Sequence, residues 1–350
     1  MDSTMNNKWL GIIFLTPIIA VCKQDVAITS DVISTQQIET IITNVNNQYP
    51  DAEPSLKQDI ADVVVKSIEN MVFVEGGSFM MGDFLMPCMN DDLNRPVWTP
   101  EAKCYSDYTS VETGANFLHK VTLDSYSISK YEAEMLDLDV YFQTLGLPFL
   151  QWQDDGEYLE RTPSELAYFI AQPVRTKTWQ QANDYCQWLG SVASLPFYLP
   201  TEAQWEYSAR SRGENLYYAT NNGFLQYEND IYYDEEDKVR KNFKKEDANV
   251  GSSMRIVNVG YFPPNPLGIY GMTKSTVEWV SDWYADDYYK YSPELNPTGP
   301  KVGTEKVVRG IKNIYRGYKA PVQKDYSYHL GFRCAIQQSK PVYAFGINYP

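Results

Sequence analysis

Cysteine and histidine are the residues of this chain whose chemistry would be most telling, and both are scarce. The 350 residues include two histidines, His119 and His329, which are too few for a three-histidine metal site. No His-Glu-x-x-His motif occurs. No Cys-x-x-Cys pair occurs either, which argues against a zinc site or thioredoxin-like redox chemistry. The five cysteines are Cys22, Cys88, Cys104, Cys186 and Cys334.

Cys22 stands apart because it directly follows an apolar run from Trp9 to Val21. With Lys8 before it, this run is too short to span a bilayer and has the length of a signal-peptide core. The cysteine resembles the lipidation site of bacterial lipoproteins, although Val21 stands where a small residue is usual. The alternative is an ordinary secretory signal in which Cys22 is incidental. Both interpretations make residues 1–22 a signal peptide and place the mature protein outside the cytoplasm, where disulfides form.

Composition excludes several classes of protein. The chain carries 30 basic and 45 acidic side chains, and its formal charge of −15 argues against a general nucleic-acid binder, which must neutralise phosphates. With 43% apolar and 21% charged residues, the chain is globular rather than disordered. Aromatic residues reach 14%, an excess that fits either a loop-rich core or a binding surface.

Any chemistry must be positioned by elements that the apolar pattern predicts. We expect a polar tether over residues 23–57. An amphipathic helix follows over 55–70, because apolar residues recur there at helical spacing. Residues 58–337 then form one main domain, and 338–350 form a C-terminal tail. No segment after the signal peptide is long and apolar enough to span a membrane.

Secondary-structure signals inside the main domain are few but clear. Residues 71–74 and 119–130 are typical of strands, and 131–145 is typical of a helix. Thr178 and Thr201 each open a further helix. Thr201 is a strong N-cap candidate because acidic residues follow it in the first turn.

A series of short motifs runs in order along the main domain. It opens with Met-Val-Phe-Val-Glu-Gly-Gly-Ser-Phe-Met-Met-Gly at 71–82, and its most distinctive segment is Leu-Pro-Thr-Glu-Ala-Gln-Trp-Glu-Tyr at 199–207. The series resembles the formylglycine-generating enzyme, or sulfatase-modifying-factor, family. Its other motifs are His119-x-Val121-x-Leu123, Tyr131-Glu132, Pro173-Val174, Trp179-x-x-Ala182-x-x-Tyr185-Cys186, Phe262-Pro263-Pro264-Asn265-Pro266, Glu278-Trp279-x-x-Asp282-Trp283, Val308-Arg309-Gly310 and Gly331-Phe332-Arg333-Cys334.

The resemblance implies the family's fold. This is an α+β fold, a distorted C-type-lectin-like domain with little regular secondary structure. The abundance of Tyr, Asn, Gly and Pro over residues 215–271, which predicts loops, agrees with it.

The family's chemistry depends on two cysteines. Formylglycine-generating members oxidise a substrate cysteine with molecular oxygen and copper, and soft thiolates are the ligands that select Cu(I). In the family, these cysteines lie between an Arg-Gly-Gly-Ser segment and Gly-Phe-Arg-Cys. Here Arg309 and Gly310 are followed by Ile311 and Lys312, and residues 309–321 contain no cysteine. The comparison implies a member that has lost both the activity and the copper.

Calcium is the second metal that the resemblance raises. The family binds a structural Ca²⁺ at a segment that corresponds to residues 271–279, through hard oxygen ligands. Glu278 and Thr276 are the candidate ligands here. Gly271 occupies the leading ligand position, and Lys274 replaces a glycine with an ammonium that could pair with Glu278. We therefore expect this site to be lost or weakened. A branch that binds iron through several histidines is excluded by their scarcity.

Four cysteines remain when Cys22 is set aside, and four allow three pairings. Cys186 and Cys334 match family positions that pair, which implies a disulfide between them and leaves Cys88 with Cys104. The rival interpretation is free buried thiols.

These features lead to a function hypothesis, a non-catalytic, extracytoplasmic binding protein. Where the family has its catalytic floor, this chain carries Lys312, Tyr315, Tyr318 and Lys319, and such residues suit protein recognition. Signal-bearing members resemble partner-binding lipoproteins, including periplasmic immunity proteins that neutralise secreted, phospholipase-like (type VI) toxins. An acidic chain would suit a basic toxin. We expect a protein partner, no nucleic acid, no cofactor beyond the calcium candidate, and membrane contact only through a lipid anchor.

Two other functions stay open. One is a formylglycine-generating-type oxidase, or a related oxidoreductase, with relocated residues. The other is a structural envelope lipoprotein of a secretion or motility machine.

Overall fold

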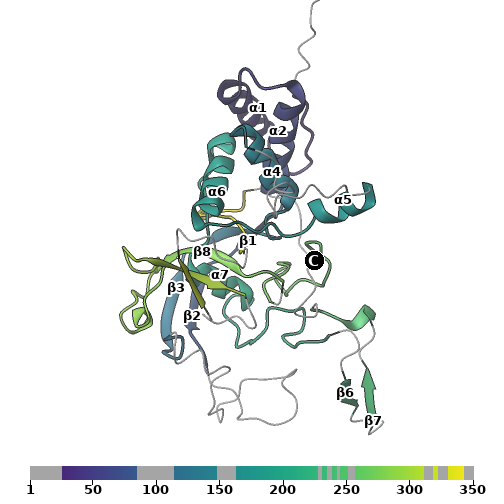
Figure 1. Ribbon diagram of the computed structural model, residues 1–350. Helices are drawn as coiled ribbons and strands as arrows, with labels where there is room; N and C mark the ends of the chain where they lie inside the picture. Colours follow the sequence, from purple (N-terminus) through teal and green to yellow (C-terminus); the bar gives the residue numbers. More distant parts are fainter. Residues whose placement is uncertain are drawn as a thin grey trace, which may run out of the picture.

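Most of the helices gather at one end of the molecule, and short strands, loops and one further helix fill the other end (Figure 1). Two buried apolar clusters follow this division, one centred on the helices and one on the strands and loops. This arrangement confirms the expected α+β fold with little regular structure. Within the described residues, no helix has both the length and the apolar character needed to cross a membrane. The computed structural model describes residues 26–84, 114–147, 163–227, 231–234, 239–242, 245–250, 257–273, 275–310, 318–321 and 330–342.

The helices and strands keep the labels of Figure 1. The helices are α1 (Thr35–Gln48), α2 (Pro54–Glu69), α4 (Met135–Thr144), α5 (Pro163–Ile170), α6 (Trp179–Ala193) and α7 (Glu202–Ala209). The strands are β1 (Met71–Val74), β2 (Gly77–Met81), β3 (His119–Leu123), β4 (Tyr126–Ser129), β5 (Phe197–Tyr198), β6 (Ile231–Asp234), β7 (Val239–Asn242), β8 (Glu278–Trp283), β9 (Glu305–Arg309), β10 (Tyr318–Pro321), β11 (Gly331–Phe332) and β12 (Ala335–Ile336).

Two helices begin where their N-cap threonines predict. The Thr178 hydroxyl accepts a hydrogen bond from the Gln181 backbone N–H at the start of α6, and Thr201 does the same with Gln204 at the start of α7. In both cases the glutamine side chain returns to the backbone N–H of the cap, which completes a capping box. The expected helix over 55–70 is also present as α2.

Helix α1 differs from the expectation of a loose polar tether. Its apolar side buries Ile41 and Val45 completely, and its polar side chains serve as caps for another helix. Gln37, Asn44 and Gln48 donate hydrogen bonds of 2.6, 2.8 and 3.0 Å to carbonyl groups in the last turn of α6. Those carbonyls lack partners within their own helix. The amide side chains that resemble a tether in the sequence therefore fix α1 onto α6.

The segment before α1 also touches the helical core. Val26 and Ile28 pack partly against it, and the backbone of Ala27 exchanges hydrogen bonds of 2.9 and 2.8 Å with the Gln58 side chain on α2. Residues 26–28 are therefore already in contact with the helical core, ahead of residue 58, where the sequence predicts the start of the main domain.

Two small four-stranded sheets frame the rest of the fold. The first has the order β1-β4-β12-β5, and the second has the order β10-β9-β8-β11, in which β11 runs parallel to β8. The segment 119–130, expected as one strand, divides at Asp124 into β3 and β4, which pair in different sheets. The Asp124 backbone N–H donates instead to the Asn296 side chain at 2.8 Å, which turns the chain between the two strands.

A disulfide joins the helical layer to the first sheet. Cys186 on α6 bonds to Cys334, directly before β12, with a Cα–Cα distance of 5.7 Å. The pairing implied by the family resemblance is therefore present. Because it closes a loop of 148 residues, it restricts the unfolded chain strongly. Cys22, Cys88 and Cys104 lie outside the described residues.

Removal of the buried face of α1 tests whether this helix belongs to the folded domain. Ile41→Ala should lower the free energy of unfolding by about 2–4 kcal/mol, because it leaves a cavity in the helical core. Glu39→Ala, on the exposed side of the same helix, should change it by less than about 0.5 kcal/mol. Urea unfolding measures both. Equal effects of the two variants would mean that α1 does not pack on the domain.

Candidate functional site

The segment that the sequence resemblance predicts at the family's catalytic floor follows β9. Arg309 ends this strand, and Gly310 leaves it with a φ of 94° that favours glycine. Lys312 and Tyr315 lie outside the described residues. The backbones of Tyr318 and Lys319 lie on β10, opposite Val308 and Val307 of β9, but their side chains are not described. The structure therefore places half of the predicted binding residues on one strand and leaves their grouping untested.

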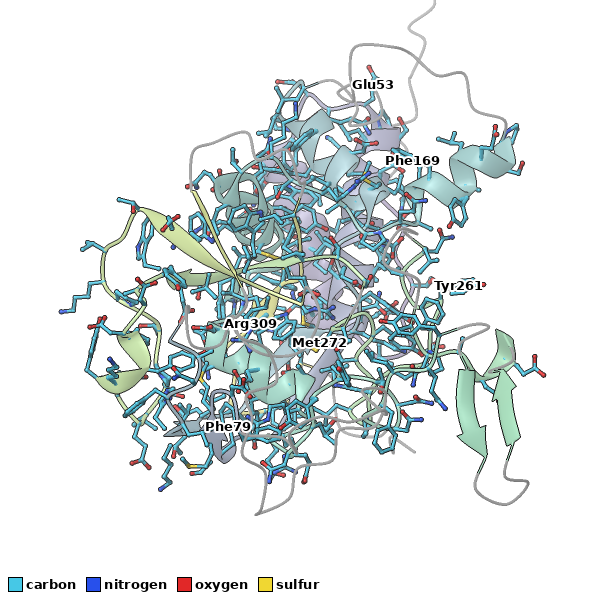
Figure 2. All side chains as sticks on the ribbon, turned by 60° about the horizontal axis from the view of Figure 1, so that its bottom comes forward. Glu53, Phe79, Phe169, Tyr261, Met272 and Arg309 are labelled. Atoms are coloured by element: carbon cyan, nitrogen blue, oxygen red, sulfur yellow. A yellow bond between two sulfur atoms is a disulfide. The ribbon has the colours of Figure 1, made fainter. Side chains whose placement is uncertain are left out.

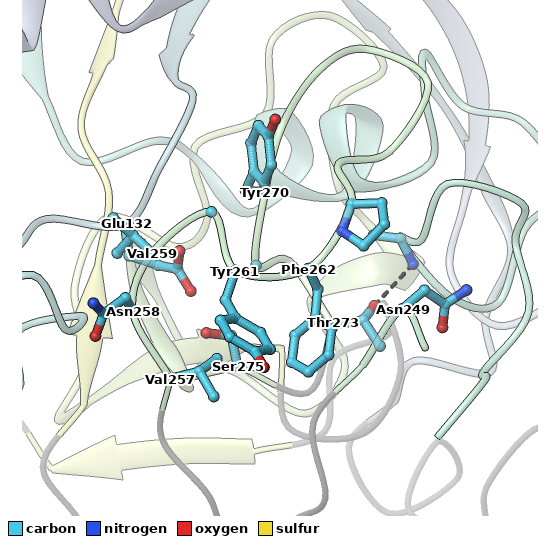
Figure 3. A pocket seen from close by; sticks show the side chains of 14 residues that line it. Glu132, Asn249, Val257, Asn258, Val259, Tyr261, Phe262, Tyr270, Thr273 and Ser275 are labelled. Atoms are coloured by element: carbon cyan, nitrogen blue, oxygen red, sulfur yellow. Dashed lines mark hydrogen bonds between the residues drawn. The ribbon is translucent and has the colours of Figure 1, made fainter. Parts of the chain in front are cut away.

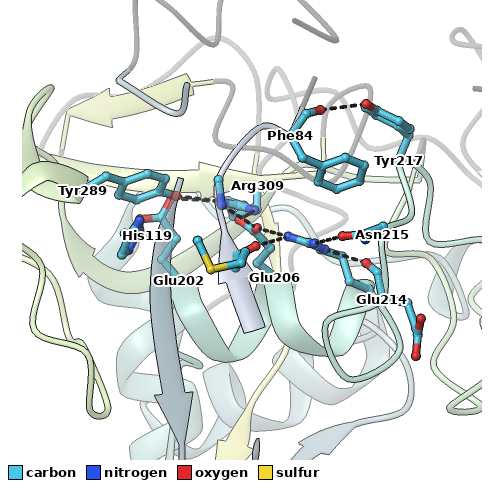
Figure 4. A network of polar contacts seen from close by, with 12 residues as sticks. Phe84, His119, Glu202, Glu206, Glu214, Asn215, Tyr217, Tyr289 and Arg309 are labelled. Carbon is cyan, nitrogen blue, oxygen red and sulfur yellow. Dashed lines mark hydrogen bonds and ion pairs between the residues drawn. The ribbon is translucent and has the colours of Figure 1, made fainter. Parts of the chain in front are cut away.

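A buried network of charges supports the end of β9. Arg309 donates through Nη1 to Glu202 at 2.8 Å and through Nη2 to Glu206 at 2.7 Å. Both carboxylates project from α7, one turn apart, and none of these three side chains is more than 1% exposed. Figure 2 shows Arg309 and Met272 near the centre of the molecule, and Figure 4 shows the network from close by.

Arg210 and Tyr289 complete this network. Arg210 donates to Glu206 at 2.9 Å, so Glu206 lies between two guanidinium groups. The Tyr289 hydroxyl donates to Glu202 at 3.0 Å, and the ring of His119 packs against the Tyr289 ring with a centroid distance of 4.6 Å. The charges of the two carboxylates and the two guanidinium groups cancel, and the network joins α7 to the end of β9.

Electrostatics keep Arg309 protonated. Burial opposes its charge, but Glu206, Tyr289 and Glu202 together raise the pKa of the guanidinium above its usual value. The sequence motif containing Glu202 and Glu206 suggested only helix capping. Their spacing of four residues, followed after another four by Arg210, is the signal that could have revealed a charged face on α7.

A second buried network occupies the calcium candidate. Arg333 donates to Glu278 through Nη2 at 2.7 Å and through Nε at 2.8 Å, and the Trp205 indole N–H donates to the same carboxylate at 2.9 Å. A dication at this place would displace those donors and meet the Arg333 charge. The residues around Glu278 therefore do not fit Ca²⁺. Arg333 holds the position of the cation, a role that the sequence analysis gave to Lys274, which lies outside the described residues.

Thr276, the other calcium candidate, has a packing role. Its methyl group lies where a side chain on Gly331 would project, only 2.3 Å from an added Cβ. The glycine of the Gly-Phe-Arg-Cys motif thus makes room for Thr276 as β11 pairs with β8. In the described part of the chain, no three His, Cys, Asp or Glu side chains come together as metal ligands.

Glu132 is the least satisfied acid near this network. Its carboxylate is buried and receives no hydrogen bond of full strength from the described residues, although the Ser275 side chain lies close enough to lower its pKa. Arg333 lies 3.7 Å away. Burial raises the pKa of Glu132, while the Arg333 charge opposes the rise. The carboxylate borders a cavity of about 30 Å³, large enough for a water molecule, beside Thr273 and Asn258 (Figure 3).

Lys306 on β9 is enclosed by two aromatic rings. Its Nζ lies 3.9 Å from the ring centroids of both Trp179 and Trp283, and it donates to the Ser281 carbonyl at 2.6 Å. Only 3% of the residue is exposed. Burial lowers the pKa of Lys306 to about 8, and Asp282 limits the fall. The ring faces favour the ammonium, so the lysine joins α6 to the second sheet.

The fold and these buried ion pairs define an α+β domain in which small sheets lie beneath a layer of helices. Comparison with known proteins gives the same result. The Sulfatase-modifying factor enzyme 1-like domain family matches residues 57–338. The chain belongs to this family.

Three curated relatives illustrate how widely the domain is used. Serine/threonine-protein kinase pkn1 of Chlamydia pneumoniae is 32% identical over 77% of this chain, which spans only 38% of the kinase. Formylglycine-generating enzyme of Streptomyces coelicolor is 27% identical over 77% of this chain and 90% of its own length. Inactive C-alpha-formylglycine-generating enzyme 2 of Mus musculus is 26% identical over 77% and 87%, respectively.

Arg309 provides a test of the buried charge network. Arg309→Met should lower the free energy of unfolding by about 3–5 kcal/mol, because it removes the guanidinium that compensates Glu202 and Glu206. Arg212→Met, which breaks an exposed ion pair with Glu75, should cost at most about 1 kcal/mol. Urea unfolding of both variants checks this. A loss at Arg309 no larger than the loss at Arg212 would show that the network contributes little.

Lys306 provides a test by pH. Between pH 8 and 10.5, the unfolded chain holds a proton on Lys306 that the folded chain has released. Stability from this group should therefore rise as the pH increases through that window. Urea unfolding at pH values that span the window from 8 to 10.5, with Lys306→Met as reference and exposed Lys301→Met as control, measures the difference. A difference that stays flat or falls with pH would contradict the lowered pKa.

Proposed function

We propose that this protein is a non-catalytic, extracytoplasmic binding protein on a formylglycine-generating-enzyme-like scaffold. The observation that carries the proposal is the absence of thiolate ligands where the family reacts. Residues 311–321, which follow the end of β9, contain no cysteine. Cys186 and Cys334, the two cysteines of the described part, are bonded to each other and supply no thiolate. Cu(I) requires soft ligands of this kind.

The geometry beneath the hairpin suits a binding surface. The carboxylates of Glu202 and Glu206 are compensated by guanidinium groups in the network under Arg309. Such a support holds the end of β9 in place, and its charged side chains are buried and paired with one another, so they do not act as a surface acid or base. Lys312, Tyr315, Tyr318 and Lys319, which follow Arg309 in the sequence, are the proposed recognition residues. The Mus musculus relative is named as inactive, which agrees with a fold that is kept after its catalytic activity is lost.

Two features support an extracytoplasmic location. The disulfide between Cys186 and Cys334 is typical of oxidising compartments, and residues 1–22 have the pattern of a secretory signal. On this proposal the protein crosses the inner membrane and stays in the periplasm or is held on the outer membrane through a lipid on Cys22.

The partner is proposed from charge and resemblance together. A chain of charge −15 favours a basic protein surface, and a secreted phospholipase-like toxin neutralised by a periplasmic immunity protein fits that chemistry. The identity of the neighbouring gene is the simplest indicator of the partner. A toxin gene would support immunity, whereas a sulfatase gene would favour the oxidase alternative.

The central prediction concerns thiol oxidation. Protein incubated with Cu(I), oxygen and a Cys-x-Pro-x-Arg peptide should leave the peptide thiol unchanged, because no thiolate pair is present to bind the metal at the family position. Thiol titration and mass spectrometry of the peptide measure this. The Streptomyces coelicolor relative, assayed in parallel, is the positive control. Conversion of the peptide cysteine to formylglycine would overturn the proposal and establish an oxidase with relocated residues.

A further inference from the structure

Glu132 belongs to a buried charge cluster that is not balanced. Glu132, Glu278 and Arg333 are each at most 3% exposed. Arg333 donates to Glu278 at 2.7 and 2.8 Å, whereas it lies 3.7 Å from Glu132. Among the described residues, no other cationic side chain pairs with Glu132. One guanidinium group therefore faces two carboxylates. Because a buried carboxylate without a full partner is costly, the cluster is short of one positive charge.

The Glu132 carboxylate is held in one place beside a small cavity. Gly271 makes room for it, because a Cβ added there would lie 2.2 Å from the carboxylate. The backbone is fixed by the Ala133 N–H, which donates to the Phe332 carbonyl at 2.9 Å. The cavity of about 30 Å³ that the carboxylate borders is also lined by Asn258, whose Oδ1 is a buried acceptor without a described donor. Both side chains therefore call for a donor from outside.

An aromatic groove adjoins this cavity. It has a volume of about 570 Å³, within the range of small-molecule sites, and Tyr261, Phe262 and Tyr270 line both the groove and the cavity (Figure 3). Tyr261 is 45% exposed, and its ring meets that of Phe262 edge to face at a centroid distance of 4.9 Å. Tyr270 already receives the Lys130 ammonium, 5.6 Å from its ring centroid. Tyr261 and Phe262 therefore offer the ring surface for a further cation.

The cavity and the groove together favour an organic ammonium over a metal ion. Ca²⁺ takes about six to eight oxygen ligands, whereas only two described side chains here have acceptors in need of a donor. The cavity holds one group of the size of a water molecule, which a primary ammonium matches and a trimethylammonium exceeds. Aromatic rings attract organic cations and also cover an apolar stem.

We propose that this site binds a small primary ammonium ion, with its –NH₃⁺ group in the cavity beside Glu132 and Asn258 and its apolar stem on the rings of Tyr261 and Phe262. The ammonium would donate to the buried acceptors and supply the missing positive charge. This proposal goes beyond the proposed function, because its residues lie outside 311–321 and it holds whether or not the protein is an enzyme.

Titration with n-butylammonium, followed by saturation-transfer NMR of the ligand, tests the proposal. Wild-type protein should bind it with a Kd of about 1 mM or tighter, which is reasonable for so small a ligand. Two relatives of the probe separate charge from size. 1-Butanol has no charge, and n-butyltrimethylammonium is too large for the cavity. Each should bind at least about tenfold more weakly than n-butylammonium.

Two pairs of variants locate the binding. Glu132→Gln, which keeps the shape of the side chain, should weaken binding about tenfold or more. Glu134→Gln, in which the carboxylate lost is one that pairs with Lys66, should leave it unchanged. Tyr261→Ala should weaken binding about threefold or more, whereas Tyr291→Ala, at another exposed ring, should have no effect. Urea unfolding checks that each variant is folded. Because Tyr261 is exposed, its variant still tests the site if Glu132→Gln does not fold.

Several results would overturn the proposal. These are a failure of wild-type protein to bind n-butylammonium, equal binding by wild type and Tyr261→Ala, or displacement of the probe by micromolar Ca²⁺, which would mark a metal site. If only a Lys274→Met variant binds the probe, a lysine of the chain itself fills the cavity and the proposed ligand is refuted. None of these results bears on the thiol assay, so the two proposals fail separately.

Discussion

Three arginines without exposed side-chain surface hold the loop-rich half of this protein together. Arg210, Arg309 and Arg333 are each fully buried, and each bonds to a carboxylate. Two of them also satisfy backbone carbonyls at strand ends and in loops. Arg210 donates to the carbonyls of Met80 and Glu214, and Arg333 donates to those of Ser129, Lys130 and Tyr270. Buried backbone N–H and C=O groups must be hydrogen-bonded. A fold with little regular secondary structure leaves many of these groups without a backbone partner. A guanidinium group, with five donors in a fixed plane, meets that need where helices and sheets do not.

This constraint explains why the scaffold can keep its shape while its surface changes. Glu202 and Glu206 sit on α7, and Glu278 opens β8, so the charge pairs connect elements that lie beneath the β9–β10 hairpin. Relatives whose names denote an active and an inactive enzyme share the domain, which fits a framework that is separate from its reactive segment.

Local signals in the sequence were sufficient for part of this fold. The capping threonines predicted α6 and α7, and helical spacing predicted α2, because these features depend on neighbours in the chain. The family resemblance supplied the disulfide. Contacts between distant residues could not be foreseen. The pairing of Glu278 with Arg333, the enclosure of Lys306 by two tryptophans and the capping of α6 by α1 all join segments far apart in sequence. The polar residues of α1 suggest a tether because the carbonyl groups of α6 that accept their hydrogen bonds cannot be identified from the sequence.

The contact of Val26 and Ile28 with the helical core has a consequence for orientation on the proposal that Cys22 carries a lipid. Val26 and Ile28 already touch the helical core, so a lipid on Cys22 would be separated from it by a chain of at most about 14 Å when fully extended. A linker of this length would keep the domain close to the bilayer surface. Its helical layer would face the membrane, and the sheets and loops at the opposite end would be presented to the aqueous compartment as the outward side (Figure 1).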